Sequence, residues 1–313
     1  MTAVRNARDN VMSSSQIVLN TAPTWHDYIA LCKPRVVALI VFTAVAGMLL
    51  ASPALVPASV LVFGTLGIGL AAAAGATINQ LVDQPADTVM NRTRQRPLPT
   101  GRIRSGSAGL FAALLCVLSM VLLTAQVNLL TAILTLVSMV GYAVIYTVYL
   151  KRATPQNIVI GGAAGAMPPV LGWTAVTGSL DPHALLLFMI IFAWTPPHFW
   201  ALAIHRRAEY ARAGIPMLPV THGVAFARLQ ILLYTIILCA VSLLPFATGM
   251  SGIVYLAAAL ILGARFLYHA LRLYRGRDPR QPMRTFGYSI QYLALLFAAL
   301  LVDHYLPGAG FGS

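Results

Sequence analysis

Two carboxylates four residues apart form the clearest chemical signal in this chain. Asp83 and Asp87 lie just beyond an uncharged apolar run, residues 61–78, and Asn79 lies one helical turn before Asp83. On a helix these three polar positions share one face. Carboxylate and amide oxygens suit Mg²⁺, which often holds a substrate phosphate at the same time. The spacing predicts metal-assisted phosphate chemistry at the end of a membrane helix.

Cationic side chains lie close to these acids. Arg92, Arg94, Arg96 and Arg102 follow Asp87 along the chain. Guanidinium groups bind phosphate oxygens through two hydrogen bonds, so they suit the phosphate itself. A solvated loop whose arginines only mark the cytoplasmic side is the alternative interpretation.

A second cationic pair stands at the end of a later apolar run. Lys151 and Arg152 follow Tyr146 and Tyr149. Two adjacent cations at the mouth of a helix could clamp a diphosphate. Anchoring of the helix at the membrane surface explains the same residues equally well.

Histidines mark a third candidate position. His198 follows Pro196-Pro197 inside an apolar run, and His205 and Glu209 follow at spacings of seven and four. At 3.6 residues per turn these three side chains fall within about 40° of one another. Ionisable groups inside membranes are usually functional. The alternative is a packed, hydrogen-bonded histidine.

The composition identifies the elements that must position these residues. Of 313 residues, 58% are hydrophobic and 9% are charged, against about 25% charged in soluble domains. The chain is therefore predicted to be an all-α polytopic membrane protein, and its net charge of +13 indicates topology rather than nucleic-acid binding. The three cysteines show no metal-binding spacing.

Nine apolar runs are long enough to cross a bilayer. They cover residues 36–52, 58–81, 107–125, 128–149, 157–176, 183–204, 226–246, 250–272 and 286–306. With a cytoplasmic N-terminus, all 21 Lys and Arg residues fall in or beside the cytoplasmic segments, as the positive-inside rule requires. We expect a disordered cytoplasmic tail over 1–26, a nine-helix domain around a central cavity over 27–306, and a short external tail over 307–313.

Several stretches resemble the UbiA-type intramembrane prenyltransferases. The segment from Asn79 to Leu98 is similar to the first signature of that superfamily. Its protohaem IX farnesyltransferase branch is indicated by Lys33-Pro34-Arg35, by the Lys151–Asn157 segment, by the Gly165–Trp173 segment, by Pro197-His198-Phe199-Trp200 and by the Gly214–Pro219 segment.

The resemblance implies an Mg²⁺-dependent transfer of farnesyl from farnesyl diphosphate to a vinyl group of haem b, giving haem O for terminal oxidases. It implies a multi-pass protein of the cell inner membrane, with the active site toward the cytoplasm and with haem-handling or oxidase-assembly proteins as partners. The implied roles divide the candidates into four sets. They are catalytic Asp83, Asp87, Lys151 and Tyr146; diphosphate-binding Asn79, Arg92, Arg96, Lys151 and Arg152; haem-binding His198, His205 and Arg206; and metal-binding Asp83, Asp87 and Glu209.

Two positions depart from the pattern of that branch. Pro85 stands where members often carry a third acid, and a proline there predicts that the helix ends or kinks near residues 82–83. Glu209 stands where an aspartate is frequent. Both departures affect the expected geometry of the metal site.

Other functions remain open from the sequence. The acceptor could be an aromatic acid or a quinone precursor. A secondary transporter would carry polar groups at the membrane midplane in both halves, whereas here they gather at one face. A haem-delivery chaperone would need the histidines but not the Asp and Arg residues.

The charge pattern makes a testable prediction about topology. Reporters fused after Arg104, Arg152 or Arg212 should give a cytoplasmic signal, whereas reporters at Gln126 or Gly178 should give an external one. Alkaline phosphatase and fluorescent-protein fusions would measure this. An external signal at residue 104 would contradict the nine-helix topology.

Overall fold

The described part of the chain, residues 22–306 of a computed structural model, consists of helices without a strand. Residues 1–21 of the predicted N-terminal tail and the whole predicted tail 307–313 lie outside the described residues. The first described helix begins at Trp25, inside the predicted tail 1–26. In the first half the helices are α2 (Trp25–Leu31), α3 (Pro34–Leu50), α4 (Ala58–Val89), α5 (Ser105–Gln126), α6 (Leu129–Val140), η1 (Gly141–Leu150), α7 (Lys151–Ala153), α8 (Asn157–Ala166) and α9 (Pro168–Thr177). In the second half they are α10 (Pro182–His205), α11 (Arg207–Arg212), α12 (Leu218–Thr221), α13 (Gly223–Val241), α14 (Leu244–Ala247), α15 (Ile253–Arg275) and α16 (Gln281–Tyr305).

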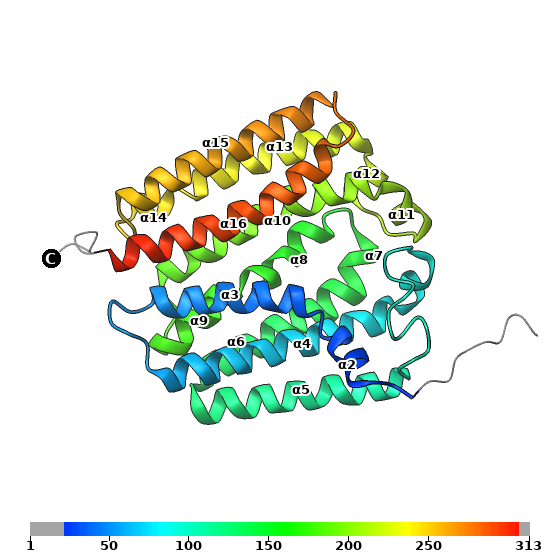
Figure 1. Cartoon of the computed structure of the whole chain (residues 1–313), viewed down its shortest axis with the longest axis horizontal. Helices are drawn as coiled ribbons and strands as arrows, with labels where there is room; N and C mark the ends of the chain where they lie inside the picture. Colours follow the sequence, from blue (N-terminus) through cyan, green and yellow to red (C-terminus); the bar gives the residue numbers. More distant parts are fainter. Residues whose placement is uncertain (1–21, 307–313) are drawn as a thin grey trace, which may run out of the picture.

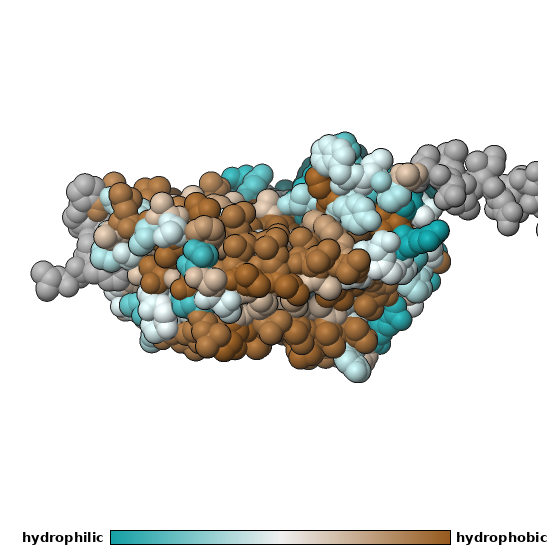
Figure 2. All heavy atoms as spheres, turned by 90° about the horizontal axis from the view of Figure 1, so that it is seen from below, coloured by the Kyte–Doolittle hydropathy of each residue, from teal (hydrophilic) through white to brown (hydrophobic). Residues whose placement is uncertain are grey.

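The predicted membrane spans are confirmed. Eight helical segments of the described chain are long and apolar enough to cross a bilayer. The bent pair α2–α3, with 55° between its helices, passes the same criteria when its two helices are taken together and is the candidate for a ninth span. The long helices run roughly parallel (Figure 1), and hydrophobic residues cover the middle of the face shown in Figure 2. A multi-pass membrane protein with an all-α fold follows from this arrangement.

Helix α4 differs from the sequence prediction. It continues through Pro85 to Val89 as one helix of 32 residues, so the expectation that the helix ends near residues 82–83 is wrong. Pro85 is exposed, whereas Asp83 and Asp87 are buried. The carbonyl left without a helical partner therefore lies on the solvent side, where the missing hydrogen bond costs least.

The fourth span is built from three segments. A π-helix, η1, joins α6 to α7 and covers ten residues. Long π segments are rare and usually mark functional positions, because the wider turn redirects side chains. Thr147 Oγ1 donates to the Tyr142 carbonyl, five residues earlier, at 2.8 Å.

Two glycines let α3 and α9 touch through their backbones. A Cβ atom on Gly47 would lie 2.2 Å from the Pro169 carbonyl oxygen, and one on Gly172 would lie 1.9 Å from the Ala44 carbonyl oxygen. Small residues at helix contacts permit such close packing in membranes. This contact fixes α3, which lines one wall of the cavity described below.

Gly47→Ala should therefore destabilise the protein by about 1–3 kcal/mol, the usual cost of overpacking. Thermal unfolding in detergent would measure it. Gly109→Ala on α5 is the matched control, because an added Cβ there meets nothing within 4 Å. Equal melting temperatures for the two variants would contradict the close contact.

Candidate active site

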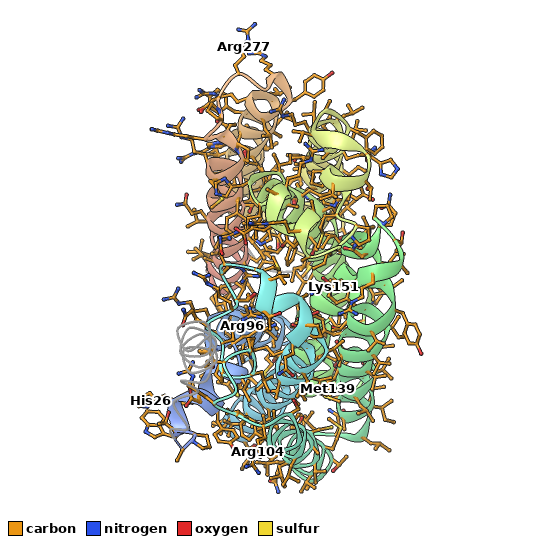
Figure 3. The ribbon with its side chains drawn as sticks, turned by 90° about the vertical axis from the view of Figure 1, so that its right-hand side faces the viewer. His26, Arg96, Arg104, Met139, Lys151 and Arg277 are labelled. Carbon is orange, nitrogen blue, oxygen red and sulfur yellow. The ribbon has the colours of Figure 1, made fainter. Side chains whose placement is uncertain are left out.

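A single large cavity contains most of the predicted site residues. Its volume is about 1350 Å³, and its walls come from α3, α4, η1, α8, α10 and α16. Charged side chains line one end of it and apolar side chains line the remainder; the charged set is Lys33, Arg35, Asp83, Asp87, Arg92, Arg96 and Lys151. We call this charged end the mouth. Figure 3 views that end of the molecule and shows Arg96 and Lys151 toward its middle, with His26, Arg104 and Arg277 farther out.

Both predicted aspartates carry ion pairs at the mouth. Lys151 Nζ lies 2.5 Å from Asp83 Oδ2, and Arg96 Nη1 lies 2.6 Å from Asp87 Oδ2. Asp83 and Asp87 are only 5% and 4% exposed, so each carboxylate needs such a partner to remain charged. The structure thus brings both acids and two of the predicted diphosphate-binding cations together.

Arg92, one of the charged residues of the mouth, and Tyr210 both line the cavity. Partial burial lowers the pKa of Arg92 from its usual value, and repulsion from Arg96 is the second cause of this lowering. Burial raises the pKa of the Tyr210 phenol. An incoming anion would relieve the repulsion between neighbouring guanidinium groups.

Asn79 connects three segments of the chain. Its Oδ1 accepts a hydrogen bond from Lys33 Nζ, and its Nδ2 donates to Thr147 Oγ1 at 3.2 Å. Lys33 has a φ of 50°, the only positive φ of a non-glycine residue in residues 22–306. Such backbone strain is common at functional sites. The sequence analysis did not assign Lys33 to the site. A charged residue directly before the proline that opens a helix could have indicated this position.

Aromatic residues of η1 form the wall next to the acids. Tyr142 and Tyr146 both line the cavity, and their rings stack with centroids 5.7 Å apart. Gly161 leaves room for Tyr146, because a Cβ there would lie 2.1 Å from the ring. The predicted residue Tyr146 therefore lies in the site, and Tyr142 is an addition that the sequence analysis missed.

Only one of the three haem-binding candidates reaches the cavity. His198 lines it, as predicted, in its apolar part together with Trp194 and Phe286. The cavity walls include neither His205, which is exposed at the end of α10, nor Arg206.

The predicted metal set of three carboxylates does not assemble. Within residues 22–306 no three acids, histidines or cysteines come together as a metal site. Glu209 instead accepts a hydrogen bond from Arg206 Nη1 at 3.2 Å, because the two residues are three apart on the chain and helix α11 begins between them. Asp83 and Asp87 still fit Mg²⁺. Each uses only Oδ2 in its ion pair, and one or two carboxylates plus substrate phosphates are a usual Mg²⁺ environment.

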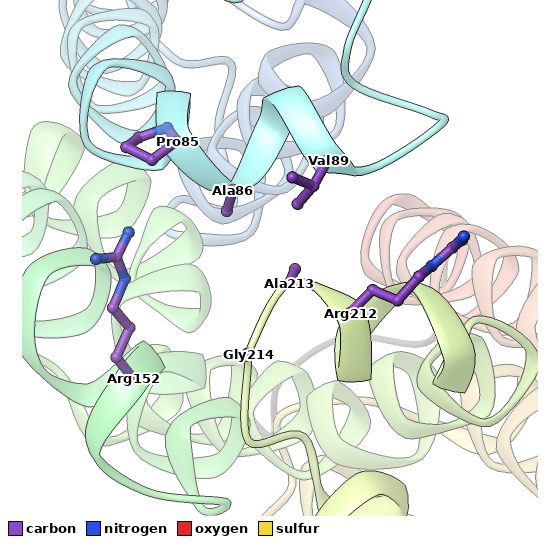
Figure 4. A pocket seen from close by; sticks show the side chains of 7 residues that line it. All are labelled: Pro85, Ala86, Val89, Arg152, Arg212, Ala213 and Gly214. Atoms are coloured by element: carbon purple, nitrogen blue, oxygen red, sulfur yellow. The ribbon is translucent and has the colours of Figure 1, made fainter.

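Arg152 lies apart from its neighbour Lys151. It lines a neighbouring pocket of about 410 Å³ formed by the end of α4, Arg212 and the residues after α11, which shares Ala86 with the large cavity. Figure 4 shows the two arginines on opposite sides of this pocket. The adjacent positions diverge because successive helical side chains point about 100° apart.

Proteins similar to this chain were found over nearly its whole length. A protein of Marinobacter nauticus named protoheme IX farnesyltransferase is 65% identical over 90% of this chain and 94% of its own length. Relatives of the same name from Nitrosococcus oceani and Methylococcus capsulatus are each 60% identical, over 95% and 90% of this chain and 99% and 95% of their own lengths.

Solved structures with the same fold share little sequence. A structure from work on digeranylgeranylglyceryl phosphate synthase has a TM-score of 0.76 at 19% identity and covers 90% of this chain and 98% of its own. A UbiA homologue from Archaeoglobus fulgidus, bound to GPP and Mg²⁺, has a TM-score of 0.60 at 19% identity, over 88% of this chain and 99% of its own.

The model of the UbiA prenyltransferase family matches residues 40–301. This range contains the acids, Lys151 and His198. Sequence match, fold and site geometry agree, and the chain belongs to the UbiA prenyltransferase family.

Proposed function

We propose that this protein transfers a farnesyl group from farnesyl diphosphate to a vinyl group of haem b, giving haem O and diphosphate. The observation that carries this proposal is the single cavity that joins a charged mouth to an apolar interior containing His198. Its volume of about 1350 Å³ exceeds the roughly 300–1000 Å³ typical of one drug-sized ligand, so it can hold a donor and an acceptor together. The name of the relatives supports haem over a small aromatic acid as the acceptor.

The cations of the mouth bind the diphosphate of the donor. Lys151 and Arg96 are held in place by the two aspartates, and Arg92 and Lys33 line the same wall. Charge grows on the departing oxygens as the carbon–oxygen bond breaks, and preorganised cations stabilise that charge. Asp83 and Asp87 would hold Mg²⁺, which supplies further neutralisation of the diphosphate when bound. The A. fulgidus homologue bound to GPP and Mg²⁺ supports Mg²⁺ as the metal.

The cavity walls direct the allylic cation. Tyr142 and Tyr146 line the region next to the acids, and aromatic faces stabilise a nearby cation. The apolar interior keeps water away until the farnesyl carbon bonds to the terminal vinyl carbon. Water then adds to the other vinyl carbon and a proton is lost, which gives the hydroxyethylfarnesyl chain of haem O.

The cellular setting follows from the same proposal. The arginines and lysines of the loops at this end support a mouth at the cytoplasmic face of the cell inner membrane, because cytoplasmic loops carry an excess of these residues. The product would pass to haem-handling or oxidase-assembly proteins.

The function is tested by the complete reaction. Purified protein in lipid nanodiscs, supplied with haem b, farnesyl diphosphate and Mg²⁺, should form haem O, detected by chromatography and mass spectrometry. EDTA should abolish the reaction and excess Mg²⁺ should restore it. A protein that binds both substrates but gives no heavier haem would contradict the proposed activity.

The aspartates should each be essential. Asp83→Asn and Asp87→Asn should lower the rate of haem O formation by about 10²–10³-fold, the usual effect of removing one group that stabilises charge in the transition state. Asp278→Asn is the control, since that acid lies in the loop between α15 and α16, pairs with Arg284 of α16 and does not line the cavity. A wild-type rate of haem O formation in Asp87→Asn would contradict a role for Asp87 in the site.

A further inference from the structure

His198 is enclosed by side chains of α10 and α16, three of them aromatic. Its ring stacks on Trp194, with centroids 4.2 Å apart, and on Phe286, at 4.6 Å. Phe199 meets it edge to face at 5.2 Å. Because both faces of the imidazole are covered, only its edge atoms can act on a ligand.

One edge atom is taken by Ser289. His198 Nδ1 lies 2.7 Å from Ser289 Oγ, and Ser289 Oγ donates its own hydrogen to the Phe286 carbonyl at 2.6 Å. A serine hydroxyl has a single hydrogen to donate. Ser289 must therefore accept from His198, which assigns the proton of the neutral imidazole to Nδ1 and leaves a lone pair on Nε2.

The remaining edge atom opens onto the cavity. His198 lines the cavity, and its Nε2 is not among the fully buried polar atoms of the described chain that lack a partner. Ser289 also fixes the ring plane indirectly, because its carbonyl accepts the Trp194 indole hydrogen at 2.7 Å. One residue thus sets the tautomer of His198 and holds the indole that covers it.

We propose that Ser289 is a positioning residue that keeps His198 in its Nδ1–H form and directs the Nε2 lone pair to the iron of the haem acceptor. This inference rests on the proposed function, since it takes haem b as the occupant of the apolar interior. Neutral imidazole nitrogen is a common haem ligand. Histidines that bind metals usually donate their other N–H to a partner that orients the ring and raises its basicity, and Ser289 Oγ occupies the place of that partner.

Haem binding, measured without any prenyl donor, tests the assignment. The full chain in nanodiscs would be titrated with haem b, and resonance Raman spectra of the ferrous complex would report the iron–histidine stretch. Wild type should show this band and His198→Ala should lose it. Ser289→Ala should weaken haem binding by about 10–100-fold, the usual effect of losing such a partner, and should shift the band to lower frequency.

Three further variants make the result specific. Ser289→Thr keeps a hydroxyl and should restore the wild-type band, and Ser289→Cys, a weaker acceptor, should give a smaller shift if the alanine variant does not fold. Ser242→Ala is the matched control, because it removes another buried serine hydroxyl, the one 2.8 Å from the Tyr292 phenol, and should leave the band unchanged.

Two outcomes would overturn the inference. An unshifted band in Ser289→Ala would show that Ser289 does not act through His198. Formation of haem O by a wild-type protein without an iron–histidine band would refute the ligand role while leaving the proposed function intact. Failure of the proposed function is recognised separately, by the absence of haem O.

Discussion

Two buried ion pairs, Asp83 with Lys151 and Asp87 with Arg96, determine how the charged end of the cavity is organised. They join α4 to the start of α7 and to the loop that follows α4. Burial of an unpaired carboxylate or ammonium is costly, and removal of one partner leaves the other charge uncompensated. The fold therefore holds acids and cations together at the place where a diphosphate would bind.

This arrangement prepares the site for an exchange of partners. The cations next to Asp83 and Asp87 can turn from the carboxylates to phosphate oxygens, and the carboxylates can turn to a metal ion. Each of the paired groups then keeps a partner of opposite charge, which limits the cost of desolvation. The hydrogen bonds of Asn79 with Lys33 and Thr147 connect the same region to the π-helix. Binding at the mouth and the position of the Tyr146 wall are thus physically linked.

The sequence predicted those features that depend on local periodicity. The membrane spans, the shared face of Asp83 and Asp87, and the position of His198 inside an apolar helix follow from helical spacing and hydropathy. Pro85 was misleading, because the effect of a proline depends on whether its helix face meets solvent or a neighbouring helix. The sequence did not reveal the π-helix η1, nor the packing of its Tyr146 ring against Gly161 of α8.

Contacts between side chains of the site could not be predicted from spacing along the chain. The resemblance grouped Glu209 with the two aspartates, whereas in the folded chain Glu209 pairs with Arg206, three residues away. Arg152 was grouped with Lys151 by adjacency, although successive helical positions face different directions. Conversely, Lys33 and Ser289 are distant in sequence from the groups they contact, so only the folded chain reveals them.

The central claim is a division of binding within one cavity. The mouth binds the diphosphate, and the apolar interior binds haem. Separate affinities for farnesyl diphosphate and haem b, measured on folded Lys151→Ala and His198→Ala proteins, test it most directly. We predict that Lys151→Ala weakens only the binding of farnesyl diphosphate and that His198→Ala weakens only the binding of haem. Parallel losses of both ligands in both variants would contradict the division.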